Sequence, residues 1–538
     1  MPRPPKRWHL ADPAPADHLA RFPDLDPAVT QVLYNRGLVE PGAIARFLAR
    51  EDCESDPFDL AGMEAAVARL RRAVRDDEPI AIYGDFDVDG VTATALCVQT
   101  LRALGAHPIA HIPHRVDEGY GLNNETLSRL AAKGIHLILT VDCGVRSLAE
   151  VAHAAAAGID IVVTDHHSVG PQLPPAVAVL DPKRPDNPKP VHDLAGVGVA
   201  YKLAQALLRR EREDPIASRQ VTLRADELLD LVALGSVADL VPLVGENRTL
   251  VHRGLEILNR MERPGIEALC RRAGLRQGSI DSTAIGFGLG PRINAAGRLA
   301  HANTAYSLLE TSSPDEAKRL AGELDRLNRE RQELTRTIHQ AAREAALASA
   351  DGAHLLFAAD SSFPAGIVGL VAGRLVDEFY RPAIVVEVGE EVSRGSARSI
   401  SEFHITEALD QCEDLLIRHG GHAAAAGFSV RNEDLEPLAR RLRDLAKEQL
   451  DELDLAPTLE VDLETDLSRM SWALVNQLAQ LQPCGMGNPQ PLFVSRGARL
   501  LSHRRVGDGG RHLKVTLSDG HLVWDGIAFR QGDSAAGL

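Results

Sequence analysis

The sequence has no close pair of cysteines, no long apolar run and no excess of basic residues. Its six cysteines are scattered, and none shows the C-x-x-C spacing of a structural zinc site or a redox motif. Reduced thiols are typical of cytoplasmic proteins, so we expect a cytoplasmic location. The N-terminus lacks the apolar core of a signal peptide, and no segment approaches the roughly 20 apolar residues of a membrane span. We therefore expect neither a secreted nor a membrane-embedded protein.

The charge balance of the chain is acidic. Its 59 Lys and Arg residues against 75 Asp and Glu residues give a formal net charge of −16. Because such a chain repels a polyanion at long range, binding to nucleic acid would depend on local basic grooves and on bound cations. Two candidate grooves are His503-Arg504-Arg505 with Arg511, His512 and Lys514, and Arg394 with Arg398. A solvated surface is the simpler interpretation of either basic run taken alone.

The length of the chain, 538 residues, is too great for one hydrophobic core, and about three or four domains are expected. Residues 1–75 are proline-rich and then helical. In residues 76–312, apolar runs alternate with helical patterns, which predicts a doubly wound parallel sheet, and a long amphipathic connector helix follows at 313–350. Residues 351–450 form a smaller α/β pattern. Residues 451–538 show short β-like pieces, which favours a small β-barrel; the chain ends earlier than a complete barrel needs, so a truncated barrel is one interpretation.

Acidic and histidine clusters follow successive apolar runs of the predicted parallel sheet. The runs at 80–83, 137–141 and 159–164 each look like a buried strand. The stretch 228–237 also looks like one, although residues 226–234 fit a helical segment as well. These four segments precede Asp85, Asp87 and Asp89; Asp142; Asp165, His166 and His167; and Asp239. Because the carboxyl ends of parallel strands form one binding crevice, we expect these side chains to converge. So many carboxylates require cations, which predicts a two-metal phosphoesterase site.

Other interpretations of these clusters explain less. An EF-hand calcium loop beginning at Asp85 needs a glutamate at its twelfth position, where Leu96 stands. A solvated turn with an N-capping aspartate accounts for one of the three aspartates at 85–89 and poorly for all three. The imidazole and carboxylate ligands suit Mn²⁺, Mg²⁺ or Zn²⁺, and the absence of thiolate argues against structural zinc.

The same segments carry a family resemblance. Asp-Phe-Asp-Val-Asp-Gly (85–90), Val-Asp-Cys-Gly (141–144), Thr-Asp-His-His (164–167) and Gly-Ser-Val-Ala-Asp-Leu (235–240) resemble the four motifs of the DHH phosphoesterase superfamily. Gly-Gly-His at 420–422 resembles its companion DHHA1 domain. Segments 290–299 and 483–491 are similar to the RecJ family of bacterial single-strand-specific 5′ to 3′ exonucleases. The similarity covers about residues 30–530, nearly the whole chain.

The resemblance implies two ions, Mn²⁺ or Mg²⁺, with Asp142 between them. The remaining protein ligands would be Asp89, His166 and Asp239 for one ion and Asp87 for the other. Part of the superfamily completes the second site with a histidine four residues before Asp87, and here Tyr83 stands at that position. We therefore expect the second ion to bind more weakly, with Asp85, water or the scissile phosphate filling the gap.

The chemistry expected of this site is hydrolysis of a phosphodiester. Two cations a few ångströms apart would lower the pKa of a bridging water, hold the hydroxide in line and neutralise the charge that grows on the phosphoryl oxygens. No side-chain nucleophile is then required. Because His167 is adjacent to His166, we do not expect both imidazoles to face one metal, and His167 is assigned to the scissile phosphate or the leaving oxygen.

Recognition of a 5′ end calls for further donors, such as arginine forks. Arg115, Ser396 and Arg398 are the candidates, the latter two in a predicted turn that faces the site. Contacts to nearby phosphates or sugars are expected from Asn294, Arg298, Gln332 and His422. The two glycines before His422 would let the backbone approach a phosphate closely, and a tight turn with a packed imidazole is the alternative interpretation. The C-terminal region resembles an OB-fold, where basic contacts would outweigh stacking because aromatic residues are few.

The resemblance also implies partners: single-stranded DNA with a 5′ end, a single-strand-binding protein and a helicase, for a monomer that acts in DNA repair and recombination. Two other classes of protein remain open. A DHH enzyme for pyrophosphate, cyclic dinucleotides or short RNA would share the metal site but would have little use for the C-terminal barrel. A non-catalytic nucleic-acid-binding protein would be expected to lack one of the carboxylates, and none is missing.

Overall fold

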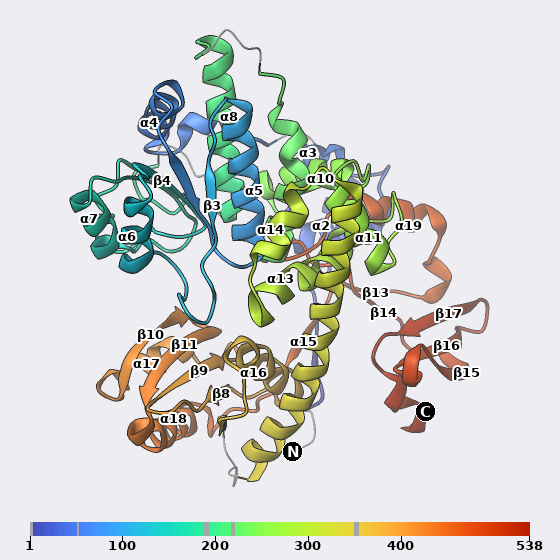
Figure 1. Ribbon diagram of the computed structural model, residues 1–538. Helices are drawn as coiled ribbons and strands as arrows, with labels where there is room; N and C mark the ends of the chain where they lie inside the picture. The colour runs from blue at the N-terminus through green and yellow to red at the C-terminus, as the bar shows by residue number, and fades with distance from the viewer. Residues whose placement is uncertain (1–3, 51–52, 188–192, 217–220, 349–353, 538) are drawn as a thin grey trace. The chain divides into compact units, whose positions relative to one another are not determined.

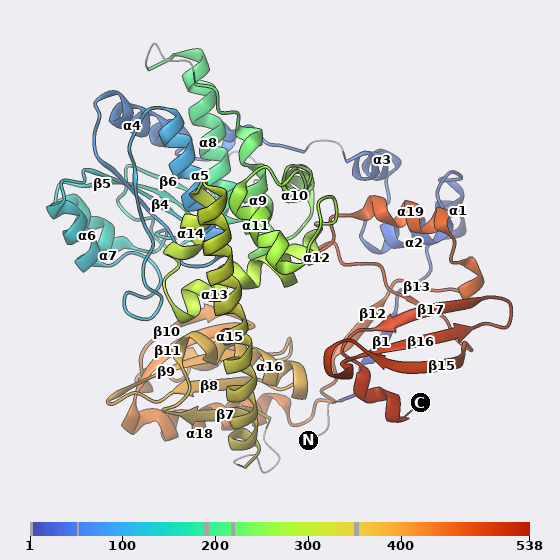
Figure 2. The ribbon, with the colours of Figure 1, turned by 45° about the vertical axis from the view of Figure 1, so that its right-hand side comes forward.

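The computed structural model describes residues 4–50, 53–187, 193–216, 221–348 and 354–537 (Figure 1). The chain forms two compact units, which Figure 2 shows from a second direction. The first consists of Asp52–Leu455 with two short additional pieces, and the second consists of Pro5–Glu51, Ala456–Cys484 and Asn488–Leu538. Among the helices of the described residues, we find none with the length and apolar character of a membrane span.

A five-stranded parallel sheet organises the first half of the first unit. Its strand order is β3-β2-β4-β5-β6. The strands are β2 (Ile80–Tyr83), β3 (Ile109–His111), β4 (Leu137–Val141), β5 (Asp160–Thr164) and β6 (Ala178–Leu180). The chain leaves β2 for β3 on one side and returns to β4 on the other, so the order reverses between β2 and β4. Open α/β sheets bind ligands beside this reversal, at the carboxyl ends of the strands.

Helices cover both faces of this sheet, which confirms the predicted doubly wound α/β fold (Figure 1). One face packs against α4 (Met63–Arg75), α5 (Val88–Ala103) and α8 (Gly196–Glu213), and the other against α6 (Asn124–Ala132) and α7 (Leu148–Ala156). Successive side chains of a strand point to opposite faces. Ile80 and Ile82 of β2 therefore join the first core, whereas Ala81 and Tyr83 join the second.

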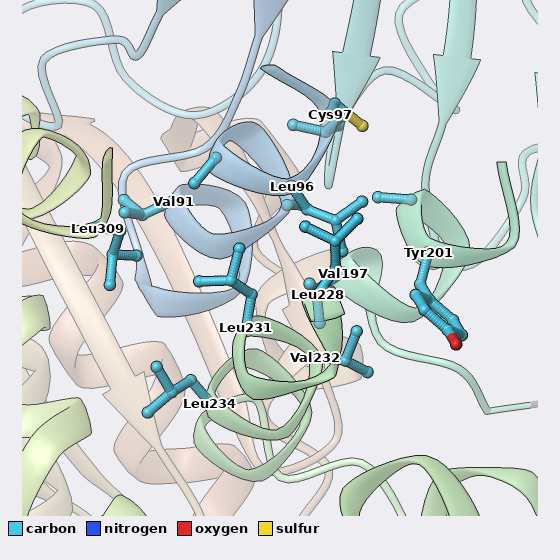
Figure 3. Packing of buried hydrophobic residues seen from close by; sticks show 14 of the residues in the cluster. Val91, Leu96, Cys97, Val197, Tyr201, Leu228, Leu231, Val232, Leu234 and Leu309 are labelled. Atoms are coloured by element: carbon cyan, nitrogen blue, oxygen red, sulfur yellow. The ribbon is translucent and has the colours of Figure 1, made fainter. Parts of the chain in front are cut away.

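The prediction of a strand at 228–237 was wrong, because this stretch is helix α9 (Leu229–Ala238). All nine residues from Leu229 to Val237 are buried, so the helix has no polar face whose period would distinguish it from a buried strand. Figure 3 shows Leu231 and Val232 of α9 packed among Leu96 of α5 and Val197 of α8. The carboxylate of Asp239 is thus delivered from the end of a helix.

The second half of this sheet domain is helical. Its elements are α10 (Gly245–Leu258), α11 (Pro264–Ala273), α12 (Ser282–Ala284), a π-helical turn η3 (Ile285–Leu289), α13 (Gly290–Leu299), α14 (Asn303–Glu310) and α15 (Pro314–Ala348). Helix α15 is the predicted connector. The Ser313 hydroxyl accepts a hydrogen bond from the Glu316 N–H at 3.4 Å and so caps the start of the helix. The helix packs against α11 and α13 near its start and against α16 and β7 near its end.

A second, mixed sheet lies within the same unit and has the order β10-β11-β9-β8-β7. Its elements are β7 (Leu356–Asp360), α16 (Ala365–Phe379), β8 (Ala383–Glu387), β9 (Val392–Arg398), α17 (Ile405–Asp410), β10 (Leu416–His422), β11 (Ala425–Arg431) and α18 (Leu435–Leu450). The turn predicted around Ser396–Arg398 is part of strand β9 instead, and Gly420–His422, for which a tight turn was one interpretation, is the end of strand β10. Gly395 makes β9 possible, because a Cβ there would lie 2.1 Å from the Phe428 ring on the neighbouring strand.

The second unit combines the N-terminal and C-terminal segments of the chain. Helices α1 (Ala16–Ala20), α2 (Pro27–Asn35), α3 (Pro41–Ala49) and α19 (Trp472–Leu478) accompany strands β1 (Arg7–Leu10), β12 (Thr458–Val461), β13 (Leu463–Glu464), β14 (Phe493–Val494), β15 (Arg499–Val506), β16 (His512–Ser518) and β17 (Val523–Ala528). Strands β15, β16 and β17 form an antiparallel sheet. Residues 5–51 belong to this unit, whereas α4 belongs to the first, so the segment expected at 1–75 is shared between two units.

Candidate active site

The acidic side chains predicted from the sequence come together at the carboxyl ends of β2, β4 and β5. These side chains form three groups, and within each group the possible ligand atoms lie within 4.8 Å of one another. The groups are Asp85, Asp87 and Asp142; Asp89, His166 and Asp239; and Asp142, His166 and His167. Asp142 belongs to two of these groups. This is the arrangement that a residue between two metal ions requires.

The polar atoms at the centre of the site fit a pair of cations. Asp85 Oδ1, Asp142 Oδ1 and His166 Nε2 are buried and have no hydrogen-bond partner among the described residues. His166 Nε2 lies 3.1 Å from Asp142 Oδ1 and 3.7 Å from Asp239 Oδ2. Buried polar atoms without partners are rare in folded proteins and point to a missing ion or ligand. The carboxylate and imidazole donors suit Mn²⁺ or Mg²⁺.

Burial and mutual repulsion shift the pKa values of this cluster strongly. Burial, reinforced by the charge of Asp87, raises the pKa of Asp85 to about 8 and that of Asp239 to about 7. Burial, together with the neighbouring His167, lowers the pKa of His166 to about 3. Histidine binds metals as the neutral imidazole, so His166 is already in the ligating form, and cations would relieve the repulsion between the carboxylates.

The N-terminus of α8 orients Asp89. The Gly196 N–H donates to Asp89 Oδ2 at 2.6 Å, and the Val197 N–H donates to Oδ1 at 2.8 Å. The first N–H groups of a helix have no partner within the helix and favour a carboxylate. Asp89, in the first turn of α5, is thereby fixed by a helix that begins over a hundred residues later.

Two glycines, which the site assignment from sequence did not include, leave room for the carboxylates. A Cβ at Gly196 would lie 2.7 Å from Asp142 Cβ and 2.8 Å from its Oδ1. A Cβ at Gly235 would lie 2.8 Å from Asp89 Oδ1. Both glycines are on helices, where alanine is otherwise the better helix former. Their requirement comes from contacts distant in sequence, which local patterns do not reveal.

The backbone at Asp142 is strained. Its φ of 62° lies in the left-handed region, which non-glycine residues rarely adopt. The Asp142 N–H donates to the Thr164 carbonyl at 3.0 Å, which fixes this conformation at the end of β4. Such strain concentrates at functional sites, where the surrounding structure holds the residue in place.

Asp165 positions the two histidines. Its carboxylate accepts the backbone N–H groups of His166 and His167 at 2.7 and 3.1 Å and lies 2.7 Å from His167 Nδ1. Burial alone would raise the pKa of Asp165, but the hydrogen bond with His167 and the charge of that imidazole outweigh it, so the pKa is lowered. The Tyr120 hydroxyl, which the sequence did not suggest, donates to the Asp142 carbonyl at 3.2 Å and lies 3.0 Å from His167 Nδ1.

The steric argument that separated the two imidazoles was wrong. Nitrogens of His166 and His167 lie within 4.8 Å of each other and of an oxygen of Asp142, so adjacency in the chain does not keep His167 away from a metal. The Nδ1 atom of His167 is engaged with Asp165, however. Its assignment to the scissile phosphate stays a prediction.

Tyr83 does not replace the histidine ligand of other superfamily members. Its side chain is fully buried in the core on the opposite face of the sheet. The hydroxyl donates to the Gly121 carbonyl at 3.0 Å and accepts from Asn123 Nδ2 at 3.3 Å. Burial raises the pKa of Tyr83, so the phenol stays protonated. Among the described residues, the group of possible ligands on this side of Asp142 consists of Asp85, Asp87 and Asp142 and contains no imidazole.

We expect this difference in ligands to give two manganese ions of unequal affinity. A position with three carboxylates and no imidazole should bind Mn²⁺ more weakly than the position with Asp89, Asp142, His166 and Asp239. Calorimetric titration of the substrate-free protein should resolve one tight and one weaker site. Two equally tight sites would contradict the expectation.

Partly buried arginines without a direct ion-pair partner form a cationic cluster beside the carboxylates. The Arg115 guanidinium lies 3.9 Å from the centre of the Phe86 ring. Burial, with repulsion from Arg115 and Arg331, lowers the pKa of Arg298 to about 9, and burial lowers that of Arg398. In the described part of the chain, no carboxylate oxygen lies within 4.0 Å of a guanidinium nitrogen of Arg115, Arg298 or Arg398. Arginines held apart from counter-ions favour an incoming anion such as phosphate.

The other residues predicted to contact the DNA strand differ in their burial and hydrogen bonding. Ser396 Oγ accepts from Arg398 Nη1 at 3.1 Å, so these two form one feature. Asn294 Oδ1 is buried and, among the described residues, without a hydrogen-bond partner. His422 is exposed on β10, and burial of its ring and then the charge of His167 lower its pKa. Gln332 is exposed on α15 and forms no side-chain hydrogen bond with the described residues; the preceding arginine approaches the cluster instead.

Three family models match the chain. The N-terminal domain of the DHH family matches residues 79–236, the DHHA1 domain matches residues 352–450, and the RecJ OB domain matches residues 461–538. The first includes all the proposed metal ligands except Asp239. The second includes Ser396, Arg398 and His422.

Relatives in several bacteria resemble the chain over most of its length. The single-stranded-DNA-specific exonuclease RecJ of Bacillus subtilis is 38% identical over 99% of this chain and 67% of the relative. The protein of that name from Salmonella typhimurium is 38% identical over 96% of this chain and 91% of the relative. The crystal structure of RecJ from Thermus thermophilus in complex with Mn²⁺ matches 98% of this chain and 74% of its own, with 31% identity and a TM-score of 0.81. The chain belongs to the RecJ family.

Proposed function

We propose that this protein is a metal-dependent single-stranded-DNA exonuclease that hydrolyses phosphodiester bonds from the 5′ end and releases 5′-mononucleotides. The observation that carries the proposal is that the arginine cluster lies next to the carboxylate cluster. Arg115 stacks on Phe86 and experiences the charges of Asp85 and Asp87. A terminal phosphate bound by the arginine cluster would therefore lie next to the carboxylates, as an enzyme that cuts beside an end requires. The names of the relatives support the same activity.

Two ions, Mn²⁺ or Mg²⁺, would be held by Asp89, Asp142, His166 and Asp239 and by Asp85, Asp87 and Asp142. Structures of RecJ from Thermus thermophilus have been solved with each of these ions. When bound, such ions activate water and neutralise charge on the phosphoryl group. The chain itself orients the reacting groups: Asp165 fixes the His167 imidazole, and the start of α8 fixes Asp89.

We assign the terminal phosphate to Arg115, Ser396 and Arg398, with Asn294, Arg298, Gln332 and His422 near the following phosphates and sugars. Arg398→Ala is expected to reduce the preference for a 5′-phosphorylated end by about tenfold or more, because a charge-assisted hydrogen bond is lost. The ratio of kcat/KM for 5′-phosphorylated and 5′-hydroxyl oligonucleotides measures this preference. Arg440→Ala, an exposed arginine on α18 of the same sheet domain, is the control. An unchanged ratio in Arg398→Ala would show that the pocket is elsewhere.

The C-terminal sheet is proposed to bind the rest of the strand. Arg504 of β15 pairs across the sheet with Lys514 of β16. Lys514 Nζ forms an ion pair with Asp525 Oδ2 at 2.9 Å, whereas Arg504 has no carboxylate within 4.0 Å among the described residues, so its guanidinium can bind a phosphate of the strand. Arg504→Ala should weaken binding of single-stranded DNA of any sequence and reduce the slope of log K against log salt by about 0.7, the value for one phosphate contact. Arg496→Ala, which removes an arginine paired with Glu464, should leave the slope unchanged.

A comparison of substrates tests the proposed activity. The protein with Mn²⁺ is offered 5′-labelled single-stranded DNA, duplex DNA, short RNA, a cyclic dinucleotide and pyrophosphate. We expect labelled mononucleotides to appear first, and only from single-stranded DNA. Preferential cleavage of short RNA or the cyclic dinucleotide would identify a small-substrate phosphodiesterase, and release of pyrophosphate products would identify a pyrophosphatase.

The proposal extends to the organisation and surroundings of the protein. We propose a DHH catalytic domain (76–312), a connector helix (313–350), a DHHA1 domain (351–450) and an OB-like domain (451–538), with the N-terminal segment (1–75) shared between the two units. The protein would act as a monomer in the cytoplasm, in DNA repair and recombination. A helicase and a single-strand-binding protein would supply its substrate.

A further inference from the structure

A cavity of about 730 Å³ adjoins the catalytic residues. Asp165 and His167 line it on one side, and strands β9, β10 and β11 line it on the other. Arg115, Arg298 and Arg398, which we assign to the DNA strand, are not part of the lining. The volume is within the range of about 300–1,000 Å³ that is typical of small-molecule sites.

The strand register gives this cavity a glycine floor. Ser396 of β9 pairs with Gly427 of β11, which pairs with Gly420 of β10. Two residues further along, Arg394 pairs with Ser429, which pairs with Arg418. Because side chains two residues apart share a face, both rows belong to the face that carries Arg398 and His422. The row with Gly427 and Gly420 lies between the row with Arg394 and Arg418 and the row with Arg398 and His422. Its glycines allow a ligand to approach the sheet closely between these two basic rows.

Three arginines without counter-ions surround the cavity, and we refer to Arg146, Arg394 and Arg418 as the arginine trio. Each donates to a neutral acceptor: Arg146 Nε to the Ser168 carbonyl at 2.7 Å, Arg394 Nη1 to the Val116 carbonyl at 3.1 Å and Arg418 Nε to Ser429 Oγ at 3.3 Å. Within the described ranges of the chain, none of the three has a carboxylate within 4.0 Å.

The acidic residues of the lining do not neutralise the trio. Glu118 pairs with Arg129 at 3.0 Å, and Asp165 pairs with His167 at 2.7 Å. Glu150 is the remaining carboxylate of the lining. In a chain with a net charge of −16, three arginines against one free carboxylate form an unusual local excess of positive charge. Such an excess favours a ligand with two negative charges, such as a phosphomonoester.

We propose that the arginine trio is a second phosphate subsite, which holds the released 5′-mononucleotide after it has left the cleavage position. The proposal rests on the proposed function. Cleavage leaves the terminal nucleotide with its phosphomonoester in the first pocket, and the next phosphate of the strand needs that pocket for the following cycle. Arg394 lies four residues from Arg398 on the same face of β9, or about 14 Å at about 3.4 Å per residue. The trio gives the departing dianion a second position on the same sheet.

Binding of thymidine 5′-monophosphate (dTMP) to the manganese-loaded protein tests the proposal, since this product contains no diester to cleave. Calorimetry should find two molecules of dTMP per chain in the wild type and one in Arg146→Gln/Arg418→Gln. Binding at the second site should weaken by at least about tenfold, because two charge-assisted contacts are lost. Arg440→Gln makes the same type of change on the exposed face of α18 and should keep both sites. Thymidine, which lacks the phosphate, should show no binding that depends on the trio.

The double variant with lysine, Arg146→Lys/Arg418→Lys, keeps the charge and should retain most of the second binding event, which distinguishes loss of charge from misfolding. The inference is overturned if the glutamine variant binds dTMP with the number of sites and affinities of the wild type, or if the wild type binds no dTMP. A failure of the proposed function would appear separately, as a lack of mononucleotide release from single-stranded DNA by the wild type.

Discussion

Replacing Gly196 with alanine is expected to slow DNA hydrolysis by about a hundredfold or more while the chain remains folded. The added methyl group would lie 2.8 Å from Asp142 Oδ1, a distance at which one of the two must move. Asp142 is held in a left-handed conformation and cannot shift without disturbing the end of β4. The start of α8 would move instead, and with it the N–H groups that orient Asp89. A displacement of about 1 Å in a catalytic group can cost about a hundredfold in rate.

The control for this substitution is Gly198→Ala, two residues further along the same helix. A Cβ there would have its nearest contact at 3.4 Å, with the Leu194 side chain. We expect the control to keep manganese binding and hydrolysis. Gly196→Ala should lose affinity for manganese and about 1–3 kcal/mol of stability, as measured by titration and chemical unfolding. Normal hydrolysis by Gly196→Ala would show that the carboxylates are not held as tightly as the structure indicates.

His167→Ala is expected to reduce kcat by about 10²–10⁴-fold and to leave both manganese ions bound. In our assignment, the imidazole contacts the scissile phosphate or the leaving oxygen, and Asp165 and Tyr120 fix its orientation. Removing it would leave the carboxylates and His166 in place. Single-turnover kinetics with single-stranded DNA, together with a count of bound manganese, measures both parts of the prediction.

The competing role for His167 is that of a metal ligand, since its ring lies close enough to Asp142 and His166. Loss of one manganese in His167→Ala would support that role and refute ours. His153→Ala removes a partly exposed imidazole on α7 that contacts Ser128, outside the site, and should change neither measurement.

The sequence predicted which side chains converge because each of them follows a recognisable segment. Asp85, Asp142 and His166 come directly after strands whose apolar runs were visible, and parallel strands end at one edge. Asp239 was expected to join these side chains and lies with Asp89 and His166, but the reason given for it was partly wrong. Its preceding segment is a helix buried on all sides, and a continuous apolar run does not distinguish such a helix from a strand.

The sequence did not show the contacts that hold these ligands in position. Gly196 and Gly235 are required by carboxylates that are distant in the chain, and Tyr120 reaches His167 from the loop after β3. On α15, Gln332 was chosen, but the structure brings the preceding Arg331 towards Arg298. One position along a helix rotates a side chain by about 100°, so only the packing of α15 decides which residue faces the cluster.

The second sheet shows a different limit of sequence reasoning. Small and polar residues such as those at 395–399 and 420–422 are typical of turns; a turn was predicted at the first and was one interpretation of the second. They form strands because each has a partner: β9 lies between β8 and β11, and β10 pairs with β11. That register, rather than any local pattern, places Arg394 and Arg418 on the face of Arg398.

Diffraction from crystals of the protein with Mn²⁺ and a short 5′-phosphorylated oligonucleotide tests the central claim most directly. The account predicts two anomalous peaks, one among Asp89, Asp142, His166 and Asp239 and one among Asp85, Asp87 and Asp142. It also predicts the 5′-terminal phosphate on Arg115, Ser396 and Arg398. A strand bound with its 3′ end in this pocket, or metal ions bound away from Asp142, would contradict the account.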